Sequence, residues 1–400
     1  MPRLLQINVN VNLGSTGKIA EQIGRVALEN GWDSSIAYSR AFKKSESALI
    51  KIGSNFSFIW HLLQARLFDR DGLGSIIATR KLIHEIERYN PDVVHLHNIH
   101  GYVLNYKHLF EYLNQKKKPV VWTFHDFWAI TGHCAYFYQC ERWKHGCGTC
   151  GKLHDYPKSL TDRSRYNIHL KRELFSNANL HLVVVSSWMK SYINESILKE
   201  KPITVIPNGV DVQMFHDMNI TTCQDVPVGE YIVLAVATKW DKRKGLRDYI
   251  KLSRLFNDDE KIVLVGLTDK QIKQLPSNIV GLRRTETQQK LVELYSRADV
   301  VLSLSYAETF GLTIAESMAC GTPVVAYDNT AQGDLLTEKT GIKVRTGDVE
   351  GVYNAIQEVK TKGKEFYSNA CRIRAEEHFD KDKCFKKYIE LYETLLNKSK

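Results

Sequence analysis

The 400-residue sequence has no run of about 20 apolar residues, the length that a membrane-spanning helix requires. It has no internal repeat and no low-complexity tract. Its first residues lead directly into an apolar, strand-like segment, without the apolar core and cleavage site of a signal peptide. The composition, 43% hydrophobic and 25% charged residues, excludes disordered and fibrous proteins. These absences predict a globular protein that stays in the cytoplasm.

An excess of acidic charge is also absent, because the formal net charge is +10. Residues 1–207 contain 27 Lys and Arg against 17 Asp and Glu, whereas residues 208–400 contain 28 of each kind. The whole excess therefore lies in the first half, which we expect to meet an acidic partner. Anionic lipid, a phosphorylated substrate and nucleic acid all satisfy this expectation.

Short runs of Val, Ile and Leu alternate with longer helical patterns along the chain. Such runs are typical of strands buried on both faces of a parallel sheet, so the sequence predicts a doubly wound α/β fold that occurs twice. Strands are predicted at Leu4–Val9, Asp92–His97, Val120–Phe124, Leu180–Ser186, Tyr231–Ala237, Lys261–Val265, Val300–Leu304 and Pro323–Ala326. Helices are predicted at Lys18–Asn30, Ala78–Tyr89, Thr287–Arg297 and Thr313–Ala319.

This pattern is interrupted at Ile206–Asp211, which contains Pro and Asn-Gly, residues typical of turns and loops. We therefore expect an N-terminal Rossmann-like domain of residues 1–207, a second one of residues 208–380 and a final helical segment of residues 381–400. Two such domains side by side bind ligands in the cleft between the carboxyl ends of their strands.

Two carboxylates, Glu308 and Glu316, stand seven residues apart around the start of a predicted helix. The backbone between them is accessible at the helix N-terminus, which is formed by Phe310, Gly311 and Leu312. The free N–H groups of a helix N-terminus favour phosphate. Carboxylates beside such a site can accept hydrogen bonds from sugar or ribose hydroxyls. The alternative is that Glu308 is a surface loop residue and Glu316 an ordinary first-turn glutamate.

A second candidate element is the basic loop after the Tyr231–Ala237 strand, where Lys239 and Lys244 lie five residues apart before a glycine. Fixed cations there could stabilise the charge that develops on a leaving diphosphate, without a metal ion. Lys242 and Arg243 lie between them, so a solvated basic loop is the alternative.

In the first half, His125 and Asp126 follow the Val120–Phe124 strand and lie at the predicted cleft edge. A histidine in this position is often only structural. His95 and His97 lie on one sheet face by period-2 alternation, so a metal pair is conceivable there.

The glycine turn Gly14-Ser15-Thr16-Gly17 opens the first helix and suits a diphosphate or an acceptor. It does not satisfy the P-loop pattern, and a plain tight turn is the alternative.

Four of the eight cysteines cluster within residues 133–151: Cys134, Cys140, Cys147 and Cys150. In a reducing compartment, this spacing suits a structural zinc site of four thiolates, with His133 and His145 as alternate ligands. Plain thiols and disulfides remain open. Four thiolates leave no open position on the metal, so a catalytic zinc is not expected.

The segment Asn55–Arg70 has large apolar residues at helical spacing, with Arg66 and Arg70 near its end. This pattern fits an amphipathic helix on a membrane surface. A helix packed on the sheet has the same pattern.

The segment Glu308–Val325 resembles the E-x7-E region of retaining nucleotide-sugar glycosyltransferases of family 4. Three further segments resemble that family in the same order along the chain: Thr123–Asp126, Ile206–Asp211 and Ala237–Gly245. The cysteine-bearing insertion resembles one subgroup, the transferases of bacterial exopolysaccharide or colanic acid type. The resemblance covers most of the chain, with one departure: Lys239 stands where the family usually has Arg, so bidentate phosphate binding is lost there.

The resemblance implies a GT-B fold, a UDP- or GDP-linked sugar as co-substrate, and no catalytic metal. It implies that Glu308 binds hydroxyls of the donor sugar and that Glu316 binds the ribose. It also implies that His125 hydrogen-bonds the donor sugar near the reacting carbon, and that Asp126 orients His125. The donor-binding set further includes Lys239, Lys244, Asn208 and the backbone of residues 310–312.

By the same resemblance, residues 14–17 face the acceptor, which we expect to be a lipid-linked sugar diphosphate or an oligosaccharide. The protein is then expected on the inner face of the plasma membrane as a peripheral enzyme, with the final helix packed back on the first domain. A nucleotide-sugar epimerase or another enzyme of the same architecture is the alternative. A phosphorylase is not expected, because the sequence does not show the lysine context in which phosphorylases bind pyridoxal. A zinc-containing nucleic-acid-binding protein would leave both glutamates and the lysine loop without a role, so no nucleic acid partner is expected.

Overall fold

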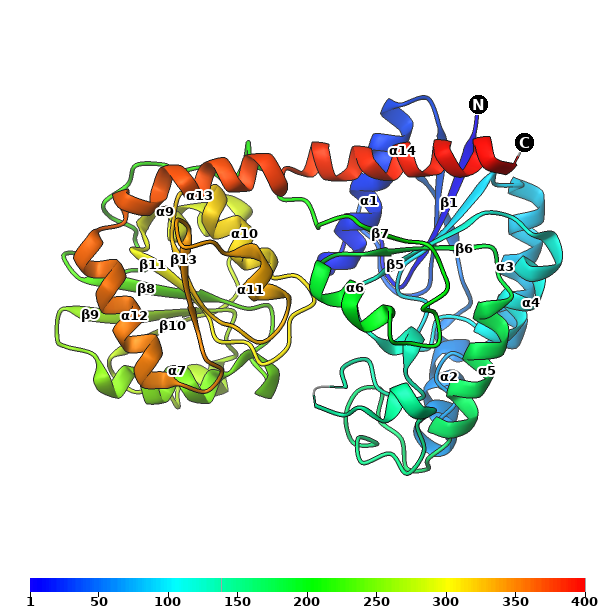
Figure 1. Ribbon diagram of the computed structural model, residues 1–400, viewed down its shortest axis with the longest axis horizontal. Coiled ribbons are helices and arrows are strands. Elements are labelled where there is room, and N and C mark those ends of the chain that lie inside the picture. The colour runs from blue at the N-terminus through cyan, green and yellow to red at the C-terminus, as the bar shows by residue number, and fades with distance from the viewer. Residues whose placement is uncertain (138, 400) are drawn as a thin grey trace. The chain divides into compact units, whose positions relative to one another are not determined.

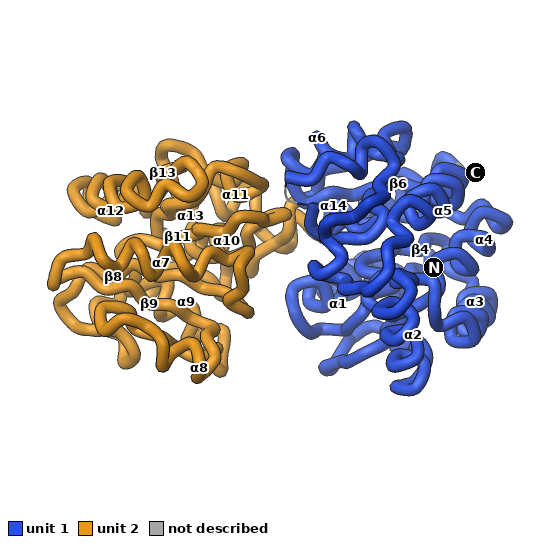
Figure 2. The backbone as a smooth tube through the Cα atoms, turned by 90° about the horizontal axis from the view of Figure 1, so that it is seen from below, with its two compact units in different colours: residues 1–206, 385–400 blue, residues 207–384 orange. Residues whose placement is uncertain are grey.

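The computed structural model describes residues 1–137 and 139–399, and the chain in it forms two compact units (Figures 1 and 2). Unit 1 comprises residues 1–206 and 385–400, and unit 2 comprises residues 207–384. Each unit is built on one parallel β-sheet flanked by helices, the predicted α/β class. Among the described residues, no helix is long and apolar enough to cross a membrane.

The sheet of unit 1 has the strand order β3-β2-β1-β4-β5-β6-β7. Its strands are β1 (Arg3–Asn8), β2 (Asp33–Tyr38), β3 (Ala48–Lys51), β4 (Val93–Leu96), β5 (Val120–Phe124), β6 (Leu180–Val184) and β7 (Ile203–Val205). Its helices are α1 (Gly14–Glu29), α2 (Asn55–Phe68), α3 (Ile76–Tyr89), α4 (Tyr106–Lys116), α5 (Ser164–Ser176) and α6 (Ser187–Ile193), with 3-10 turns η1 (Trp128–Ile130) and η2 (Arg142–His145). The strand order reverses direction between β1 and β4, where ligands of such sheets bind.

The sheet of unit 2 has the order β10-β9-β8-β11-β12-β13 and reverses between β8 and β11. Its strands are β8 (Tyr231–Val236), β9 (Glu260–Val265), β10 (Ile279–Leu282), β11 (Val300–Ser303), β12 (Val324–Tyr327) and β13 (Gly341–Val344). Its helices are α7 (Leu246–Leu252), α8 (Asp269–Ile272), α9 (Gln288–Arg297), α10 (Leu312–Ala319), α11 (Ala331–Leu335), α12 (Val349–Lys362) and α13 (Glu365–His378), with 3-10 turns η3 (Lys242–Lys244) and η4 (Ser253–Leu255).

All eight predicted strands are present, with ends shifted by at most two residues. Five strands were not predicted from the sequence: β2, β3, β7, β10 and β13. Each is short or begins with polar residues; β2 reads DSSIAY and β7 has three residues. They extend the sheets away from the two reversal points, so their omission does not affect the location of the site.

The last helix, α14 (Lys381–Ser399), begins in unit 2 and contributes its later turns to the core of unit 1. Its buried Tyr388 and Tyr392 pack in one cluster with Ile19 and Ile23 of α1. The Tyr392 ring lies 5.5 Å from that of Trp32. Burial of these large side chains anchors the helix, since each contributes about 1.5–3 kcal/mol.

Helix α2 does not pack its apolar side chains on the sheet, in contrast to one of the two interpretations of its sequence. Only His61 and Ala65 are buried. The exposed apolar side chains of this helix, which we term the α2 face, are Phe56, Ile59, Trp60, Leu63, Leu67 and Phe68. The helix has a capping box at Ser54 and ends at Asp69 in the left-handed region, so it is a well-terminated helix with an uncovered face.

Candidate active site

The loops after β8 and β11 meet at the reversal point of the unit 2 sheet, and they carry the predicted donor-binding residues. The Lys244 ammonium forms an ion pair with the Glu308 carboxylate. Arg243 lies 3.8 Å from the same oxygen and donates to the carbonyl oxygen of Ala307 at 3.1 Å. Lys239 is exposed in the same β8 loop. The structure thus brings two predicted residues together and adds Arg243, which the sequence analysis treated only as an intervening residue.

The local sequence explains why the β8 loop folds in this way. Asp241 caps η3 by accepting a hydrogen bond from the Arg243 N–H at 3.0 Å. Gly245 follows with φ +71°, and a Cβ there would lie 2.2 Å from the carbonyl oxygen of Leu304. Only glycine allows this approach of the β8 loop to the end of β11, which places Lys244 beside Glu308.

Burial alone would raise the pKa of Glu308, but Lys244 and Arg243 outweigh it and lower that pKa below its usual value. The Glu308 side chain is 13% exposed, so its charge remains within reach of a bound ligand. Before any ligand binds, the site therefore contains one carboxylate and two cations, a net charge of +1. In such a cluster, the carboxylate can accept hydrogen bonds from hydroxyl groups, and the cations can donate hydrogen bonds to phosphate oxygens.

Beside this cluster, α10 begins directly after Gly311, whose φ of +109° favours glycine. No side chain caps the helix, so its first N–H groups face outward to whatever occupies the site. Phe310 is buried against Phe379, with ring centroids 5.6 Å apart, and Leu312 is half-buried. Phe310 therefore fixes the entry of the chain into the helix.

Glu316 lies one turn into α10 and accepts a hydrogen bond from the Tyr295 hydroxyl at 2.9 Å. Tyr295 is fully buried, so it holds one carboxylate oxygen of Glu316 in place. Asn208 is also buried, in the segment that opens unit 2. Tyr295 has no signal in the sequence motif, because it comes from α9 rather than from the segment that carries the glutamates.

In unit 1, the predicted histidine at the end of β5 belongs to a larger cluster at the reversal point of the sheet. His125 Nε2 lies 3.1 Å from Nδ1 of His97, which follows β4. The rings of His95 and His97 lie 4.1 Å apart on one sheet face, as the alternation predicts. The described residues contain no group of three or more His, Cys, Asp or Glu side chains placed to hold a metal ion, so a histidine metal pair has no support.

Asp126, the residue predicted to orient His125, lies close enough to His125 to interact with it electrostatically and also has a hydrogen-bonded partner in His100. Its Oδ2 lies 2.8 Å from Nε2 of His100, and its Oδ1 accepts the N–H of Trp128 at 3.0 Å. The His100 ring stacks on Trp128 with centroids 5.1 Å apart. The two histidines that partner the predicted pair, His97 and His100, could have been found from their position just after a strand beside the reversal point.

The His100–Asp126 pair should make stability depend on pH. Burial would lower the pKa of His100, but Asp126 raises it above 6.5; the same contact lowers the pKa of Asp126 below 3.8. The pair therefore stabilises the fold fully at pH values between about 4 and 6.5, and the histidine contribution is lost as pH rises through its folded pKa. We expect the stability difference between wild type and His100→Gln in urea unfolding to be larger at pH 6 than at pH 9. A difference that grows toward pH 9 would contradict this pairing.

The predicted acceptor turn, residues 14–17, forms the first turn of α1 after β1. Gly14 and Ser15 are exposed, and no side chain caps this helix. Gly17 packs on the preceding loop, where a Cβ would lie 3.2 Å from the carbonyl oxygen of Asn10. The turn thus presents uncapped N–H groups at the end of β1, next to the strand that leads to His97.

The four clustered cysteines line one cavity of about 170 Å³ together with His133, Phe137 and Trp143. Within residues 1–137 and 139–399, no group of three or more His, Cys, Asp or Glu side chains is placed to hold a metal ion. The Cys147 sulfur accepts the N–H of Gly132 at 3.2 Å. The predicted structural zinc therefore finds no support.

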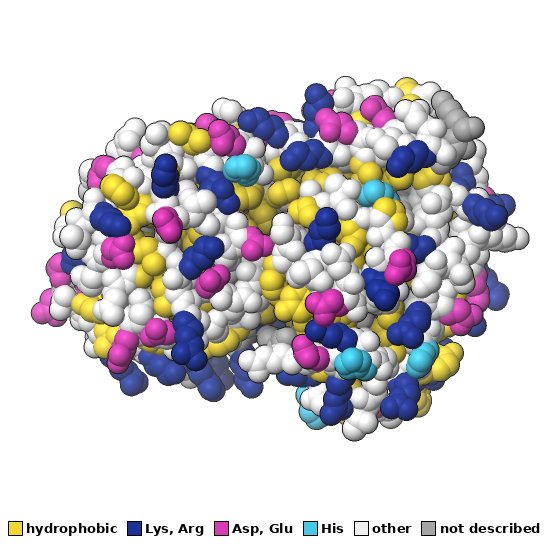
Figure 3. Space-filling model, in the orientation of Figure 1, with side chains coloured by type: hydrophobic (Ala, Val, Ile, Leu, Met, Phe, Trp, Pro, Cys, Tyr) yellow, Lys and Arg dark blue, Asp and Glu magenta, His cyan; other side chains and the backbone are white. Residues whose placement is uncertain are grey.

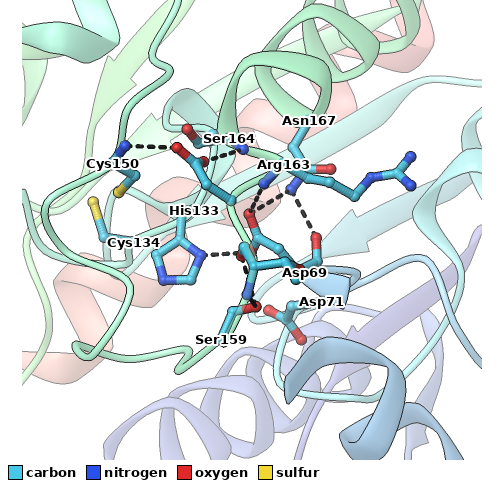
Figure 4. Close-up of polar contacts among 12 residues, drawn as sticks. Asp69, Asp71, His133, Cys134, Cys150, Ser159, Arg163, Ser164 and Asn167 are labelled. Atoms are coloured by element: carbon cyan, nitrogen blue, oxygen red, sulfur yellow. Dashed lines mark hydrogen bonds and ion pairs between the residues drawn. The ribbon is translucent and has the colours of Figure 1, made fainter. Parts of the chain in front are cut away.

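A buried polar network centred on Asp69 holds the cysteine-bearing insertion in its place (Figure 4). One carboxylate oxygen lies 2.5 Å from Nδ1 of His133, and the other accepts the N–H of Arg163 at 2.9 Å. Asn167 of α5 donates to the Asp69 carbonyl oxygen at 2.9 Å. Asp69 thus joins the end of α2, the start of the insertion and α5 by hydrogen bonds.

Two doubly wound units with polar and charged side chains at the carboxyl ends of their strands are the architecture of GT-B glycosyltransferases. Residues 27–214 match the model Glycosyltransferase Family 4, and residues 230–361 match the model Glycosyl transferases group 1. The chain belongs to the family 4 glycosyltransferases. This confirms the predicted family and enzyme class, and it gives no support to an epimerase.

Relatives with known descriptions agree with this family. The chain is 26% identical over 366 residues to a putative colanic acid biosynthesis glycosyl transferase, WcaC, from Escherichia coli, covering 86% of this chain and 88% of that protein. Its fold is similar to that of sucrose-phosphate synthase from Thermosynechococcus elongatus, with a TM-score of 0.76, 19% identity and coverage of 99% and 100%. It is also similar to Anabaena HepE in complex with UDP and glucose, with a TM-score of 0.66, 15% identity and coverage of 98% and 100%.

Proposed function

We propose that the protein transfers a sugar with retention of configuration from a UDP- or GDP-linked donor to a lipid-linked or oligosaccharide acceptor, in the synthesis of a cell-surface polysaccharide. The observation that carries this proposal is the Lys244–Glu308 ion pair beside the uncapped N-terminus of α10. It offers cations and N–H groups to a diphosphate and a carboxylate to a sugar within one site. The likeness to WcaC supports the polysaccharide context.

In this proposal, the nucleotide binds to unit 2. Lys244 and Lys239 neutralise the diphosphate, with Arg243 as an additional cation, and the backbone of residues 310–312 binds phosphate oxygens. Glu316, held by Tyr295, accepts the ribose hydroxyls. Glu308 exchanges its contact with Lys244 for hydroxyls of the donor sugar, and Asn208 belongs to the same donor-binding set. A UDP-bound solved structure of similar fold is consistent with a nucleotide-sugar donor.

Unit 1 provides the acceptor side. His125 contacts the donor sugar near the reacting carbon, and Asp126, which also pairs with His100, helps to orient His125. Residues 14–17 meet the acceptor. For the reaction itself, we propose same-face attack assisted by the leaving phosphate, because Glu308 and Glu316 are both assigned to hydroxyl binding, which leaves the donor-binding set without a protein nucleophile. The cations stabilise the leaving diphosphate more strongly as its charge develops.

A panel of nucleotide sugars tests the donor assignment. We expect a UDP- or GDP-linked sugar to raise the melting temperature, since a ligand at 100 times its Kd stabilises the folded protein by about 2.7 kcal/mol. ADP- and CMP-linked sugars serve as comparison ligands within the panel. If none of the panel stabilises wild type, while Lys244→Ala behaves like wild type, the transferase site has been assigned wrongly.

The α2 face supports a location on an anionic membrane surface. Unit 1 has 31 Lys and Arg against 19 Asp and Glu, a net charge of +12, whereas unit 2 has 24 against 26, a net charge of −2. The helix itself has no acidic residue, and Arg66 is exposed beside its apolar side chains. Figure 3 shows Lys, Arg and His side chains, with some Asp and Glu, on the lower part of unit 1, where α5 and the insertion lie in Figure 1. Apolar insertion and charge attraction act together on such a surface.

Vesicle binding tests this location. We expect wild type to bind vesicles that contain phosphatidylglycerol, to release them at high salt, and to bind phosphatidylcholine vesicles poorly. The double variant Ile59→Glu/Trp60→Glu should lose binding, because it places two anions in the α2 face. Phe366→Glu, at an exposed aromatic of unit 2, is the matched control and should bind like wild type. Equal binding to both vesicle types would count against the membrane assignment, though not against sugar transfer.

A further inference from the structure

Three buried side chains form a hydrogen-bonded chain that ends on His125, and each link has a defined direction. Gln6 of β1 is fully buried, and its Nε2 donates to the carbonyl oxygen of Ala20 at 2.8 Å. Its Oε1 therefore points the other way, to Nε2 of His97 at 3.0 Å. The reversed amide would place two oxygens 2.8 Å apart at Ala20, so this orientation is fixed by the helix α1 carbonyl.

The second link follows from the first. An amide oxygen only accepts hydrogen bonds, so Nε2 of His97 carries a proton. Burial holds the pKa of His97 well below 6.5, and the ring is neutral with one proton. Its Nδ1 must then be the acceptor, and the group that faces it at 3.1 Å is Nε2 of His125. Both nitrogens of His97 are engaged in hydrogen bonds. Neither the His97 ring nor the His125 ring can therefore move its proton to the other ring nitrogen without losing one of these bonds.

We infer that Gln6 and His97 are positioning residues that fix the tautomer of His125, with the proton on Nε2 and the acceptor lone pair on Nδ1. Burial lowers the pKa of His125 to about 4, so the ring stays in this neutral form at neutral pH. This inference rests on the proposed contact of His125 with the donor sugar, and it adds a chemical requirement. A sugar hydroxyl that contacts Nδ1 of His125 must therefore donate its hydrogen to it, since that nitrogen has no proton to give.

Fluorine can replace a hydroxyl in size but cannot donate a hydrogen bond. A monodeoxyfluoro sugar at the position that meets His125 should therefore react as poorly as the corresponding monodeoxy sugar. If His125 were in the opposite tautomer, the fluoro sugar would retain part of the interaction as a weak acceptor. The tautomer thus makes the site select for a hydrogen-donating hydroxyl at one position of the sugar.

Imidazole nitrogen NMR on the full-length protein tests the tautomer without reference to activity. We expect the His97 and His125 rings each to show a protonated Nε2 and an unprotonated Nδ1 at pH 7. Gln6→Met removes the acceptor, and it should shift both rings toward mixed tautomers. Ser34→Ala, which removes a buried hydroxyl from the neighbouring strand β2, is the control for the loss of a buried polar group and should leave both rings unchanged. A proton on Nδ1 of His125 in wild type would overturn the inference.

Kinetics with UDP-glucose and its monodeoxy and monodeoxyfluoro analogues separate this inference from the proposed function. We expect Gln6→Met to slow transfer or donor hydrolysis by about tenfold, the value of one hydrogen bond of about 1.4 kcal/mol. At one sugar position, wild type should reject the deoxy and fluoro analogues equally, and His125→Ala should lose that discrimination. If His125→Ala is fully active, the role of His125 in the proposed function is wrong even where NMR gives the expected tautomer. If the fluoro analogue alone is accepted, the tautomer inference is wrong while the transferase stands.

Discussion

Replacement of Lys244 by Ala is expected to lower kcat for sugar transfer by about 10²–10³-fold, or about 2.7–4 kcal/mol of barrier. The reason is that its ammonium lies at the reversal point of the sheet, in contact with Glu308 and beside the N-terminus of α10. Its charge becomes more favourable as the leaving diphosphate gains charge, so the loss should be in kcat more than in KM. Steady-state measurement of nucleoside diphosphate release gives both constants.

Lys242 offers the matched control, because it lies in the same 3-10 turn and is exposed. Lys242→Ala should retain kcat within about twofold, since an isolated surface charge contributes little. Lys244→Arg retains the charge with a different shape, and we expect it to recover part of the rate. Equal losses in Lys242→Ala and Lys244→Ala would mean that general positive charge, and not the position of Lys244, supports the reaction. Melting temperatures of all variants exclude simple unfolding.

Replacement of Asp69 by Ala is expected to destabilise unit 1 by about 3–5 kcal/mol. This change removes the buried partner of His133 and leaves the Arg163 N–H without its acceptor. Urea unfolding followed by tryptophan fluorescence measures the loss, because six of the seven tryptophans lie in unit 1. The insertion should become susceptible to proteolysis first, since Asp69 connects it to α2 and α5.

Asp155 is the control for this second prediction, because it lies in the same region with a surface ion pair to Lys152 and a half-exposed side chain. Asp155→Ala should change stability by less than about 0.5 kcal/mol. Treatment of wild type with a strong zinc chelator should leave stability unchanged if hydrogen bonds rather than metal order the insertion. The zinc interpretation would be restored by two results together: the chelator unfolds unit 1 of wild type, and Asp69→Ala has a stability near that of wild type.

The sequence was sufficient for the fold class, for a physical reason. Buried parallel strands such as β5 and β11 consist of near-continuous apolar runs, and the motif residues follow them directly. The loop glycines at 245 and 311 are also visible in the sequence, and both have positive φ in the structure.

What the sequence could not show are contacts between side chains that lie far apart along the chain. Asp126 has His100 as a further partner, which the loop after β4 supplies. Tyr295 reaches Glu316 from another helix, and Gln6 reaches His97 across 91 residues. The cysteine spacing suggested zinc, but spacing does not report whether sulfurs converge. Likewise, the pattern of α2 is the same whether its apolar side chains are covered or exposed.

The most direct test of the account is the anomeric form of the sugar that the protein releases from UDP-α-glucose, or from the donor that best stabilises it, when water serves as the acceptor. Proton NMR, recorded before mutarotation, distinguishes the two anomers. We expect the α-anomer to form first, together with the nucleoside diphosphate, and we expect Lys244→Ala to slow the release by about 10²–10³-fold while Lys242→Ala does not. Initial formation of the β-anomer, or release that does not depend on Lys244, would contradict this expectation.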